Sequence, residues 1–333
     1  METRKLQKIG GSTYSVSLPK EWATEHHLEA GMPIHLYPHT DGSLVVRSAT
    51  RDGGTLGSTN ITLPTADAGA VERALRAAYA VGYESITLCP PDGATFDAEE
   101  RRVVRRLVQT MVGLSVVEES ADRLTVGTLL DAGEVSIRQS VVQLQFTACA
   151  MHRTAVEALP TGVGADRLTD RDDEVDRLFA MLTRHFTRSL SDFEEIDHLD
   201  VRRSTLFEYY LVAQQLERVA DHAVRIGSLA ERVDPTVDED VLAEITALAS
   251  ASRDVVETAT SAVLESSPQR AHEALDGCDA VVDDVRTLDR ALFEASPPGG
   301  YALSRVVASL RRTAECGGNV ANVALRSSVR PEA

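Results

Sequence analysis

Residues 216–223 read LERVADHA, within a long segment whose apolar residues recur at helical spacing. Glu217 and Asp221 are four residues apart, so a helix places them one turn apart on one face. Glu217 falls within the apolar stripe of this helix, and Asp221 borders it. A carboxylate at a core-facing position is costly unless it is paired or bound to a cation. The stretch therefore predicts a packed helix whose acidic side chains need a positive partner.

The preceding helical segment carries a second pair of carboxylates at the same spacing. Asp172 lies within its apolar stripe, and Asp176 follows one turn later. If the two helices face each other, four carboxylates meet: Asp172, Asp176, Glu217 and Asp221. Oxygen-rich clusters of this kind suit Mg, Mn or Fe ions. Two alternatives remain open: a solvated acidic face, or a carboxylate network with Arg177, Arg218 and Arg225.

Six long helices account for the chain from residue 134 onward. Their predicted ranges are 134–159, 166–198, 204–233, 238–265, 269–295 and 301–328. Three helices followed by three more suggest an internal duplication. In the second set Asp279 and Asp283 repeat the first pair, but Arg311 stands where Glu217 would be. Since Arg311 and Glu315 are spaced to pair with each other, we expect a metal site in the first set. Cys278 and Cys316 add soft ligands only if they face each other.

The first fifty residues read as short strands. Their predicted ranges are 4–9, 13–18, 34–37 and 44–47, with a short helix over 20–27 and a hairpin turn at Asp41-Gly42. A module of this size cannot close a hydrophobic core alone. It therefore has to pair with something, most simply with a second copy of itself.

The middle of the chain alternates between strands and helices. Residues 51–60 are rich in Gly, Ser and Thr and read as a linker. The predicted elements that follow are strands over 61–63, 85–89, 114–118 and 123–130 and helices over 68–81 and 97–112. This pattern predicts a small α/β domain. Its arginine row is read as a solvated helix face, with an anion or partner site as the alternative: Arg101, Arg102, Arg105 and Arg106.

Composition limits the partners. The 333 residues carry a net charge of −17, which repels nucleic acid and anionic lipid, so any contact with nucleic acid has to be local. All three lysines lie within the first twenty residues. Scarce lysine with abundant acid is typical of a salty cytoplasm, as in a halophilic archaeon. We expect a cytoplasmic protein without membrane insertion, because no apolar run or secretory signal is present and the four cysteines are scattered.

The LERVADHA stretch, the upstream carboxylate pair and the duplicated three-helix layout resemble the PhoU family of phosphate-uptake regulators. The resemblance covers residues 134–328. It implies two three-helix bundles and carboxylate pairs that can hold multinuclear metal clusters, here Asp172, Asp176, Glu217 and Asp221. It also implies a role in coupling phosphate transport to signalling, with a transporter ATPase or a sensor as partner. The second bundle departs from the family pattern at Arg311, Glu315 and Cys316.

Residues 3–48 resemble the SpoVT/AbrB swapped-hairpin family, through KLQKIGGS (5–12), LPKEW (18–22) and LEAGMPI (28–34). Members of that family are intertwined β dimers, and many bind DNA through basic residues near the first strand and turn. The matching positions here are Arg4, Lys5, Lys8 and Lys20. The alternative is dimerisation without DNA. His26, His27, His35 and His39 also gather in this module and are read as exposed loop side chains rather than a metal site.

These observations predict a multidomain chain: a swapped-hairpin β module, a small α/β domain and an all-α pair of three-helix bundles. The expected ranges are 1–50, 51–60 for the linker, 61–130, 131–235 and 236–330. The first functional reading is a phosphate-responsive transcriptional regulator. It would bind DNA as an N-terminal homodimer and sense metal, phosphate or a transporter partner through its bundles. The alternative is an adaptor that only dimerises through its N-terminus. Without a catalytic triad, HExxH or a phosphate-cradling loop, an enzyme is the weakest reading.

Overall fold

The computed structural model describes residues 3–38, 42–48, 56–129, 132–162 and 166–330. The chain divides into two compact units, Met1–Asp52 and Gly53–Ala333. The expected turn residue Asp41 and His39 lie outside the described residues. No helix among the described residues combines the length and apolar character that crossing a membrane requires.

The first unit consists of two antiparallel hairpins and a short helix. Its elements are β1 (Gln7–Ile9), β2 (Thr13–Ser15), α1 (Lys20–Glu25), β3 (His35–Pro38) and β4 (Leu44–Arg47). Lys8 faces Tyr14 in the first hairpin, and Leu36 faces Val46 in the second. None of the described residues of this unit is buried. The unit therefore has no hydrophobic core of its own.

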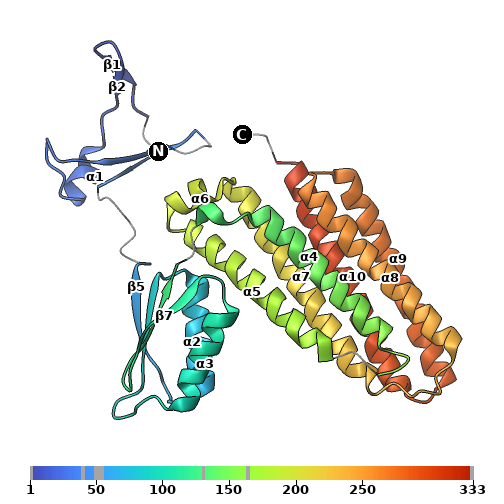
Figure 1. Ribbon diagram of the computed structural model, residues 1–333. Helices are drawn as coiled ribbons and strands as arrows, with labels where there is room; N and C mark the ends of the chain where they lie inside the picture. Colours follow the sequence, from blue (N-terminus) through green and yellow to red (C-terminus); the bar gives the residue numbers. More distant parts are fainter. Residues whose placement is uncertain (1–2, 39–41, 49–55, 130–131, 163–165, 331–333) are drawn as a thin grey trace. The chain divides into compact units, whose positions relative to one another are not determined.

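The second unit begins with the α/β domain expected from the sequence. Its elements are β5 (Ser58–Thr62), α2 (Ala68–Val81), β6 (Ser85–Cys89), α3 (Ala98–Thr110), β7 (Leu114–Glu119) and β8 (Leu124–Thr128). The sheet order is β5-β6-β8-β7; β5 and β6 run parallel, and the other pairs are antiparallel. The helices α2 and α3 cover one face of this sheet (Figure 1). Strand β5 begins at Ser58, within the segment read as a linker.

Local sequence explains how the two helices of this domain begin. The Asp67 side chain accepts a hydrogen bond from the backbone N–H of Ala70 at the start of α2. Asp97 and Glu100 form a reciprocal capping box at the start of α3. Their apolar faces meet the sheet in a core that includes Leu75, Tyr79, Ile86, Phe96 and Leu107.

The rest of the chain is helical. Its helices are α4 (Ile137–Glu157), α5 (Asp166–Ser189), α6 (Phe193–Leu199), α7 (Arg203–Ala230), α8 (Glu239–Leu264), α9 (Pro268–Ala295) and α10 (Gly300–Ser328). The first bundle contains α4, α5 and α7, and the second contains α8, α9 and α10 (Figure 1). This arrangement confirms the predicted pair of three-helix bundles.

One predicted helix is interrupted. The segment 166–198 was expected as a single helix, but it breaks after Ser189 into α5 and α6. The backbone N–H of Asp192 turns back to the carbonyl of Arg188, with an N···O distance of 2.7 Å. The break lets Glu195 of α6 contact His185 and Arg188 of α5. The contacts of Glu195 with His185 and Arg188 therefore stabilise a broken helix more than the backbone hydrogen bonds of a continuous one would.

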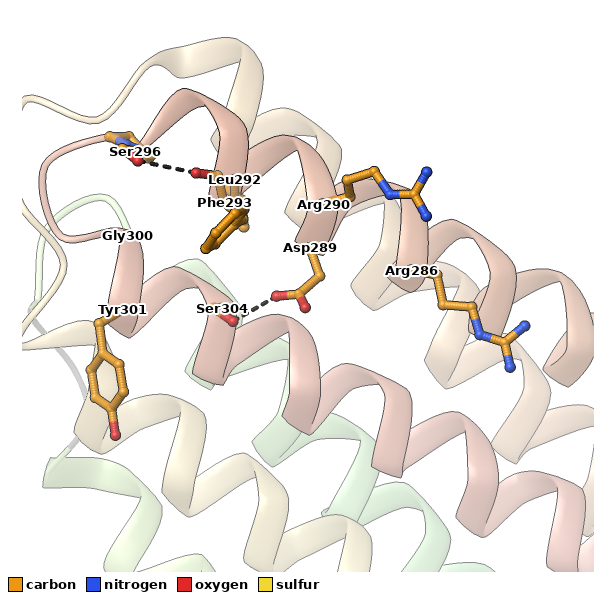
Figure 2. Close-up of a pocket in the computed structure, with 10 residues that line it drawn as sticks. Arg286, Asp289, Arg290, Leu292, Phe293, Ser296, Gly300, Tyr301 and Ser304 are labelled. Carbon is orange, nitrogen blue, oxygen red and sulfur yellow. Dashed lines mark hydrogen bonds between the residues drawn. The ribbon is translucent and has the colours of Figure 1, made fainter.

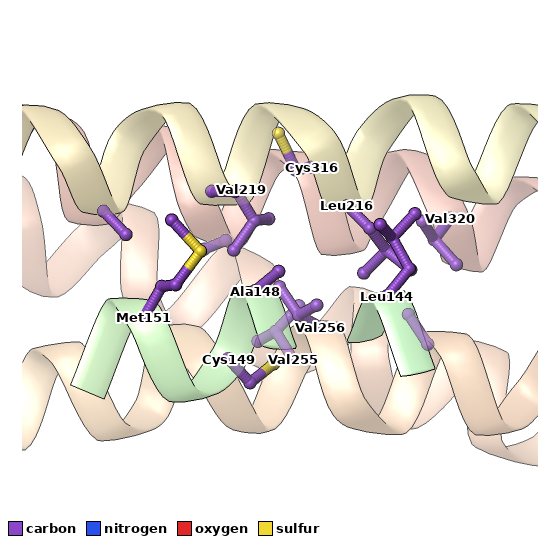
Figure 3. Close-up of a cluster of buried hydrophobic side chains, with 14 of the residues drawn as sticks. Leu144, Ala148, Cys149, Met151, Leu216, Val219, Val255, Val256, Cys316 and Val320 are labelled. Carbon is purple, nitrogen blue, oxygen red and sulfur yellow. The ribbon is translucent and has the colours of Figure 1, made fainter. Parts of the chain in front are cut away.

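The two bundles share one hydrophobic core. Figure 3 shows side chains from α4, α7, α8 and α10 interdigitating between them. Leu144, Val219 and Val256 are fully buried there, and Cys149 and Cys316 are buried free thiols. Since α7 also packs along α10, the helices form one continuous body rather than two separate modules.

Candidate functional site

The four predicted carboxylates lie on two packed helices of the first bundle. Asp172 and Asp176 are on α5, and Glu217 and Asp221 are on α7, which packs against α5. Asp172, Asp176 and Glu217 are half-buried, whereas Asp221 is exposed. The cluster therefore lies at the margin of the core, where its oxygens remain accessible to solvent.

These carboxylates repel one another. Burial, followed by the charges of Asp221 and Asp176, raises the pKa of Glu217 to about 7. Burial and the charges of Asp176 and Asp221 raise the pKa of Asp172 to about 6. Burial also raises the pKa of Asp176, although the positive charge of Arg76 acts in the opposite direction. The raised pKa values show that the negative charge of the cluster is only partly compensated.

The donor chemistry suits a hard cation, since every candidate ligand is a carboxylate oxygen. Among the residues that the structure describes, however, no three Asp, Glu, His or Cys side chains are grouped so that they could hold a metal ion. The four carboxylates are coupled through their charges but do not form a ligand set as they stand. Binding a cation would require their side chains to converge further.

The competing arginine–carboxylate network is not formed in the described part of the bundle. Arg177, Arg218 and Arg225 make no ion pair with any of the four carboxylates there, and Arg218 only lowers the pKa of Glu217 at a distance. The alternative in which these arginines contact the carboxylates directly is not observed among the described residues.

The second bundle has a different arrangement. Asp279 and Asp283 are exposed, and Asp283 pairs with Arg286. The predicted pair of Arg311 and Glu315 is confirmed, with Nε 2.8 Å from Oε1, and Arg312 contacts the same carboxylate. Glu315 is thus engaged by two guanidinium groups.

The predicted DNA-binding side chains are all at the surface of the first unit. Arg4 and Lys5 precede β1, Lys8 lies in β1, and Lys20 begins α1; each of the four is exposed. Of the clustered histidines, His26 and His27 are exposed and His35 is half-buried. The surface of this unit can therefore present positive charge to a partner.

The arginine row of α3 is used in ion pairs and a hydrogen bond. Arg105 contacts Glu119 at 2.6 Å, and Arg106 contacts Glu72 at 2.9 Å. Arg101 donates a hydrogen bond to the carbonyl of Phe96. These contacts stabilise the α/β domain. Arg102, Arg105 and Arg106 are all exposed, and Arg101 is half-buried.

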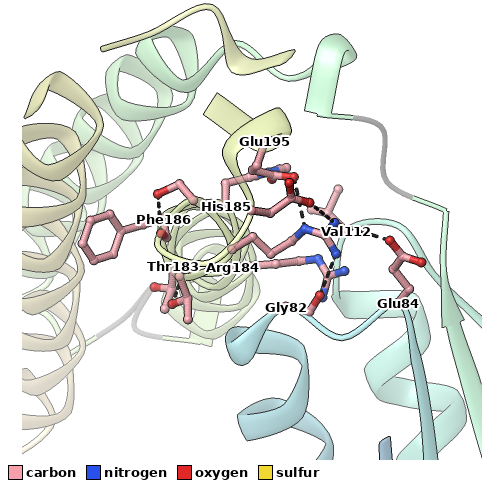
Figure 4. A network of polar contacts seen from close by, with 12 residues as sticks. Gly82, Glu84, Val112, Thr183, Arg184, His185, Phe186 and Glu195 are labelled. Carbon is pink, nitrogen blue, oxygen red and sulfur yellow. Dashed lines mark hydrogen bonds and ion pairs between the residues drawn. The ribbon is translucent and has the colours of Figure 1, made fainter. Parts of the chain in front are cut away.

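A buried polar network between α5 and the α/β domain was not anticipated. Figure 4 shows Arg184, His185 and Glu195 beside Gly82 and Glu84. Arg184 donates to the carbonyls of Tyr79 and Tyr83, and the Arg188 guanidinium donates to the carbonyl of Gly82 at 2.8 Å. The Arg184-His185 dipeptide within an apolar stripe was the available signal, but the partners of Arg184 lie 105 and 101 residues away in sequence.

Gly82 is required at this junction. Its φ of +108° lies in the left-handed region that favours glycine. A Cβ atom there would lie 2.2 Å from Cγ of Arg188. The end of α2 and the position of α5 are therefore matched to each other.

Comparison with known protein families gives two matches. Residues 141–230 match the family described as PhoU domain, and residues 7–53 match the family described as "Antidote-toxin recognition MazE, bacterial antitoxin". A search of curated proteins gives no significant match.

Two solved structures are similar to part of the chain. PhoU from Pseudomonas aeruginosa is 17% identical, with a TM-score of 0.47, over 57% of this chain and 93% of the other. The phosphate transport system regulatory protein PhoU from Streptococcus pneumoniae is 13% identical, with a TM-score of 0.48, over 58% of this chain and 93% of the other. From the two family matches and the geometry above, the chain combines a PhoU domain in its first helical bundle with an N-terminal domain of the MazE/AbrB type.

Proposed function

We propose that the chain is a phosphate-responsive transcriptional regulator that acts in the cytoplasm and has no catalytic activity. In this proposal the N-terminal unit binds DNA as a homodimer, and the helical bundles sense a cation, phosphate or a transporter partner. The observation that carries it is the presence of a MazE-type domain and a PhoU domain in one chain. A domain of the first kind fits DNA binding, and one of the second fits phosphate regulation.

The surface of the N-terminal unit supports dimerisation. Leu6, Ile9 and Tyr14 are 67%, 60% and 62% exposed, and Leu36 is 55% exposed. Apolar side chains of this size favour burial by about 1.5–3 kcal/mol each. Since no described residue of the unit is buried, a second copy is the simplest source of a shared core.

DNA binding is supported by the exposed basic side chains Arg4, Lys5, Lys8 and Lys20. A dimer would present two such sets to successive turns of a duplex. Each phosphate contact weakens with salt, so base-edge contacts have to supply part of the affinity at high salt.

The experiment is a footprint on DNA upstream of phosphate-transport genes, followed by mobility shift at the native salt concentration. The variant Lys5→Glu/Lys8→Glu should lose binding. The control Arg102→Glu/Arg123→Glu makes the same charge change at exposed positions of the second unit and should bind normally. Absence of sequence preference in the unmodified chain would contradict the regulator.

In the bundles, the proposal places a divalent cation, Mg, Mn or Fe, among Asp172, Asp176, Glu217 and Asp221. Their mutual repulsion supports it, since a cation would relieve that repulsion. Elemental analysis of the purified chain should find metal that the variant Asp172→Ala/Glu217→Ala lacks. The control Asp279→Ala/Asp283→Ala removes two exposed carboxylates of the second bundle and should retain it. Equal metal content in all three proteins would contradict the site.

The second candidate is an adaptor that regulates a phosphate transporter or a sensor by protein contact. The strong net negative charge of the chain favours it, because that charge opposes DNA binding. The Lys5→Glu/Lys8→Glu variant separates the two functions. An adaptor keeps its effect on phosphate uptake, and a DNA-binding regulator loses it.

A further inference from the structure

A hollow on the surface lies where α9 turns into α10, in the second bundle. Its volume is about 740 Å³, and Figure 2 shows its lining. Arg286 and Arg290 extend from α9 on one side, and Tyr301 projects from α10 on the other. The Asp289 carboxylate between them accepts a hydrogen bond of 2.6 Å from Ser304. Neither the carboxylate cluster nor the N-terminal unit contributes to this hollow.

Helical spacing explains why these side chains share a face. Arg286, Arg290 and Phe293 follow one another at intervals of four and three residues on α9. Tyr301 and Ser304 are three residues apart at the start of α10. Helix α9 therefore contributes a basic and aromatic strip, and the start of α10 contributes a second aromatic side chain, Tyr301.

The two aromatic side chains are unusually exposed. Phe293 is 83% and Tyr301 is 79% exposed, in a chain where aromatic residues make up only 5%. Aromatic residues and arginine are the types that dominate the binding energy of protein interfaces. Their concentration around one hollow indicates a surface that another molecule covers.

The positive charges of the hollow are available. Arg290 makes no hydrogen bond or ion pair with any residue that the structure describes. Arg286 contacts Asp283 at 2.8 Å, but both side chains are about two-thirds exposed or more, at 66% and 74%. An exposed pair of this kind contributes little and exchanges readily for a new partner. The lining carries these two arginines against one carboxylate, Asp289, which already accepts a hydrogen bond from Ser304. The hollow can therefore attract negative charge although the whole chain is acidic.

The hollow is also held in shape before anything binds. The loop between α9 and α10 contains Pro297 and Pro298, whose rings restrict the backbone angle φ. Gly299 follows with φ of +70°, and a Cβ atom there would lie 3.1 Å from the backbone nitrogen of Asp234. The loop thus lies against the connection between the two bundles. A preformed site loses little conformational entropy on binding.

We infer that this α9–α10 hollow docks an extended acidic peptide segment of a partner protein. Apolar side chains of the peptide pack on Phe293 and on Tyr301, and its carboxylates contact Arg290 and Arg286. A small anionic ligand fits less well, because such ligands are largely enclosed by their sites, whereas both aromatic walls here face solvent. This inference does not depend on DNA binding by the N-terminal unit.

The test uses the full chain and a phage-displayed library of random 12-residue peptides. Enriched sequences are made as fluorescein-labelled peptides, and their binding is measured by anisotropy. We expect Asp or Glu beside Phe, Leu or Trp in the enriched set. The variant Arg290→Glu/Phe293→Ser should weaken binding by about tenfold or more. A second variant, Arg286→Glu/Tyr301→Ser, should act in the same direction.

The chain offers a matched control. Phe146 on α4 is 76% exposed, and Arg270 is an exposed arginine outside the hollow. The variant Phe146→Ser/Arg270→Glu should therefore bind the peptides as the unmodified chain does. The inference is overturned by peptides that lack acidic residues, by no enrichment, or by equal binding to all variants. It is also overturned if the hollow variants alter the oligomeric state instead of peptide binding.

Discussion

The Arg184 guanidinium lies 5.0 Å from the centre of the Tyr79 ring and donates a hydrogen bond of 3.0 Å to the carbonyl of the same residue. It donates a second bond of 3.0 Å to the carbonyl of Tyr83. The last carbonyls of a helix have no partner within that helix. At the end of α2 the Gly82 N–H bonds the Tyr79 carbonyl, and Arg184 of α5 adds a second donor to it from outside the helix. Burial lowers the pKa of Arg184 only to about 10, so it remains charged at neutral pH. The first bundle thereby reinforces the end of a helix of the α/β domain.

Replacing Arg184 with Ala should therefore destabilise the contact between the two parts. The change removes a stacked cation and one of the two donors to each of two carbonyls, since Tyr79 keeps the Gly82 N–H and Tyr83 keeps the Thr128 hydroxyl. The expected cost is about 1–2 kcal/mol. Hydrogen exchange of α2 amides should become faster, and the midpoint of urea unfolding should fall. The exposed Arg290→Ala should change neither measurement. Unchanged exchange in α2 would show that the Arg184 contacts are not needed there.

The pH dependence of stability should report the carboxylate cluster. Glu217 has a pKa of about 7 in the folded chain against an ordinary value of 4.5. An acid with a raised folded pKa holds its proton more tightly when folded, so stability falls as pH rises from about 4.5 to about 7. Glu217→Gln should remove this loss.

The expected gain of Glu217→Gln at pH 8 is on the order of 1 kcal/mol, because solvent screens a half-buried group. That corresponds to about 2–4 °C in melting temperature by calorimetry. Below pH 4 the two proteins should melt alike. Comparing the melting temperatures of the two proteins across pH isolates the contribution of Glu217. Burial lowers the pKa of His152 to about 3, and this group affects both proteins equally. If Glu217→Gln were less stable than the unmodified chain at pH 8, the Glu217 carboxylate would not be repelled by its neighbours in the folded state.

Close packing of α10 against α8 predicts the effect of a single methyl group. A Cβ atom on Gly317 would lie 2.7 Å from Cγ1 of Val255 and 2.9 Å from the backbone nitrogen of Val256. Replacing Gly with Ala in a helix normally stabilises it by about 1 kcal/mol. Overpacking here costs about 1–3 kcal/mol, so Gly317→Ala should lower the melting temperature. Gly277→Ala is the control, since its Cβ would meet only one side-chain methyl, at 3.2 Å.

The exposed apolar surface of the N-terminal unit predicts its oligomeric state. Ile9→Asp/Leu36→Asp places charge on two side chains that are 60% and 55% exposed, so a monomer would tolerate both changes. If these side chains form a shared core, the double variant should elute as a monomer in size exclusion with light scattering. A dimer in both proteins would place the contact elsewhere.

The fold followed from periodicity and turn residues to a large extent. The range 68–81 for a helix and 85–89 for a strand agree with α2 and β6, because Asp67, Gly82 and Pro90 mark their ends. The break between α5 and α6 was missed because its cause is Glu195 contacting His185 and Arg188. Local spacing cannot show such contacts.

The candidate sites were harder to anticipate than the helices. Spacing placed Asp172, Asp176, Glu217 and Asp221 on two helices, and the structure packs these helices together. Spacing did not show that Asp221 is exposed, or that three ligands fail to converge. The α9–α10 hollow depends on the exposure of Phe293 and Tyr301 beside the loop that joins the two helices. A pattern of residue types along the sequence does not show this exposure.

Helix α5 packs against α7 through one face and against α2 through another. It is therefore a wall common to the first bundle and the α/β domain. An engineer who wished to graft this bundle onto another regulator would have to transplant residues 56–129 along with it. A graft without them would deprive the Arg184 guanidinium of the Tyr79 and Tyr83 carbonyls, whereas Arg188 would keep its contact with Glu195 of α6.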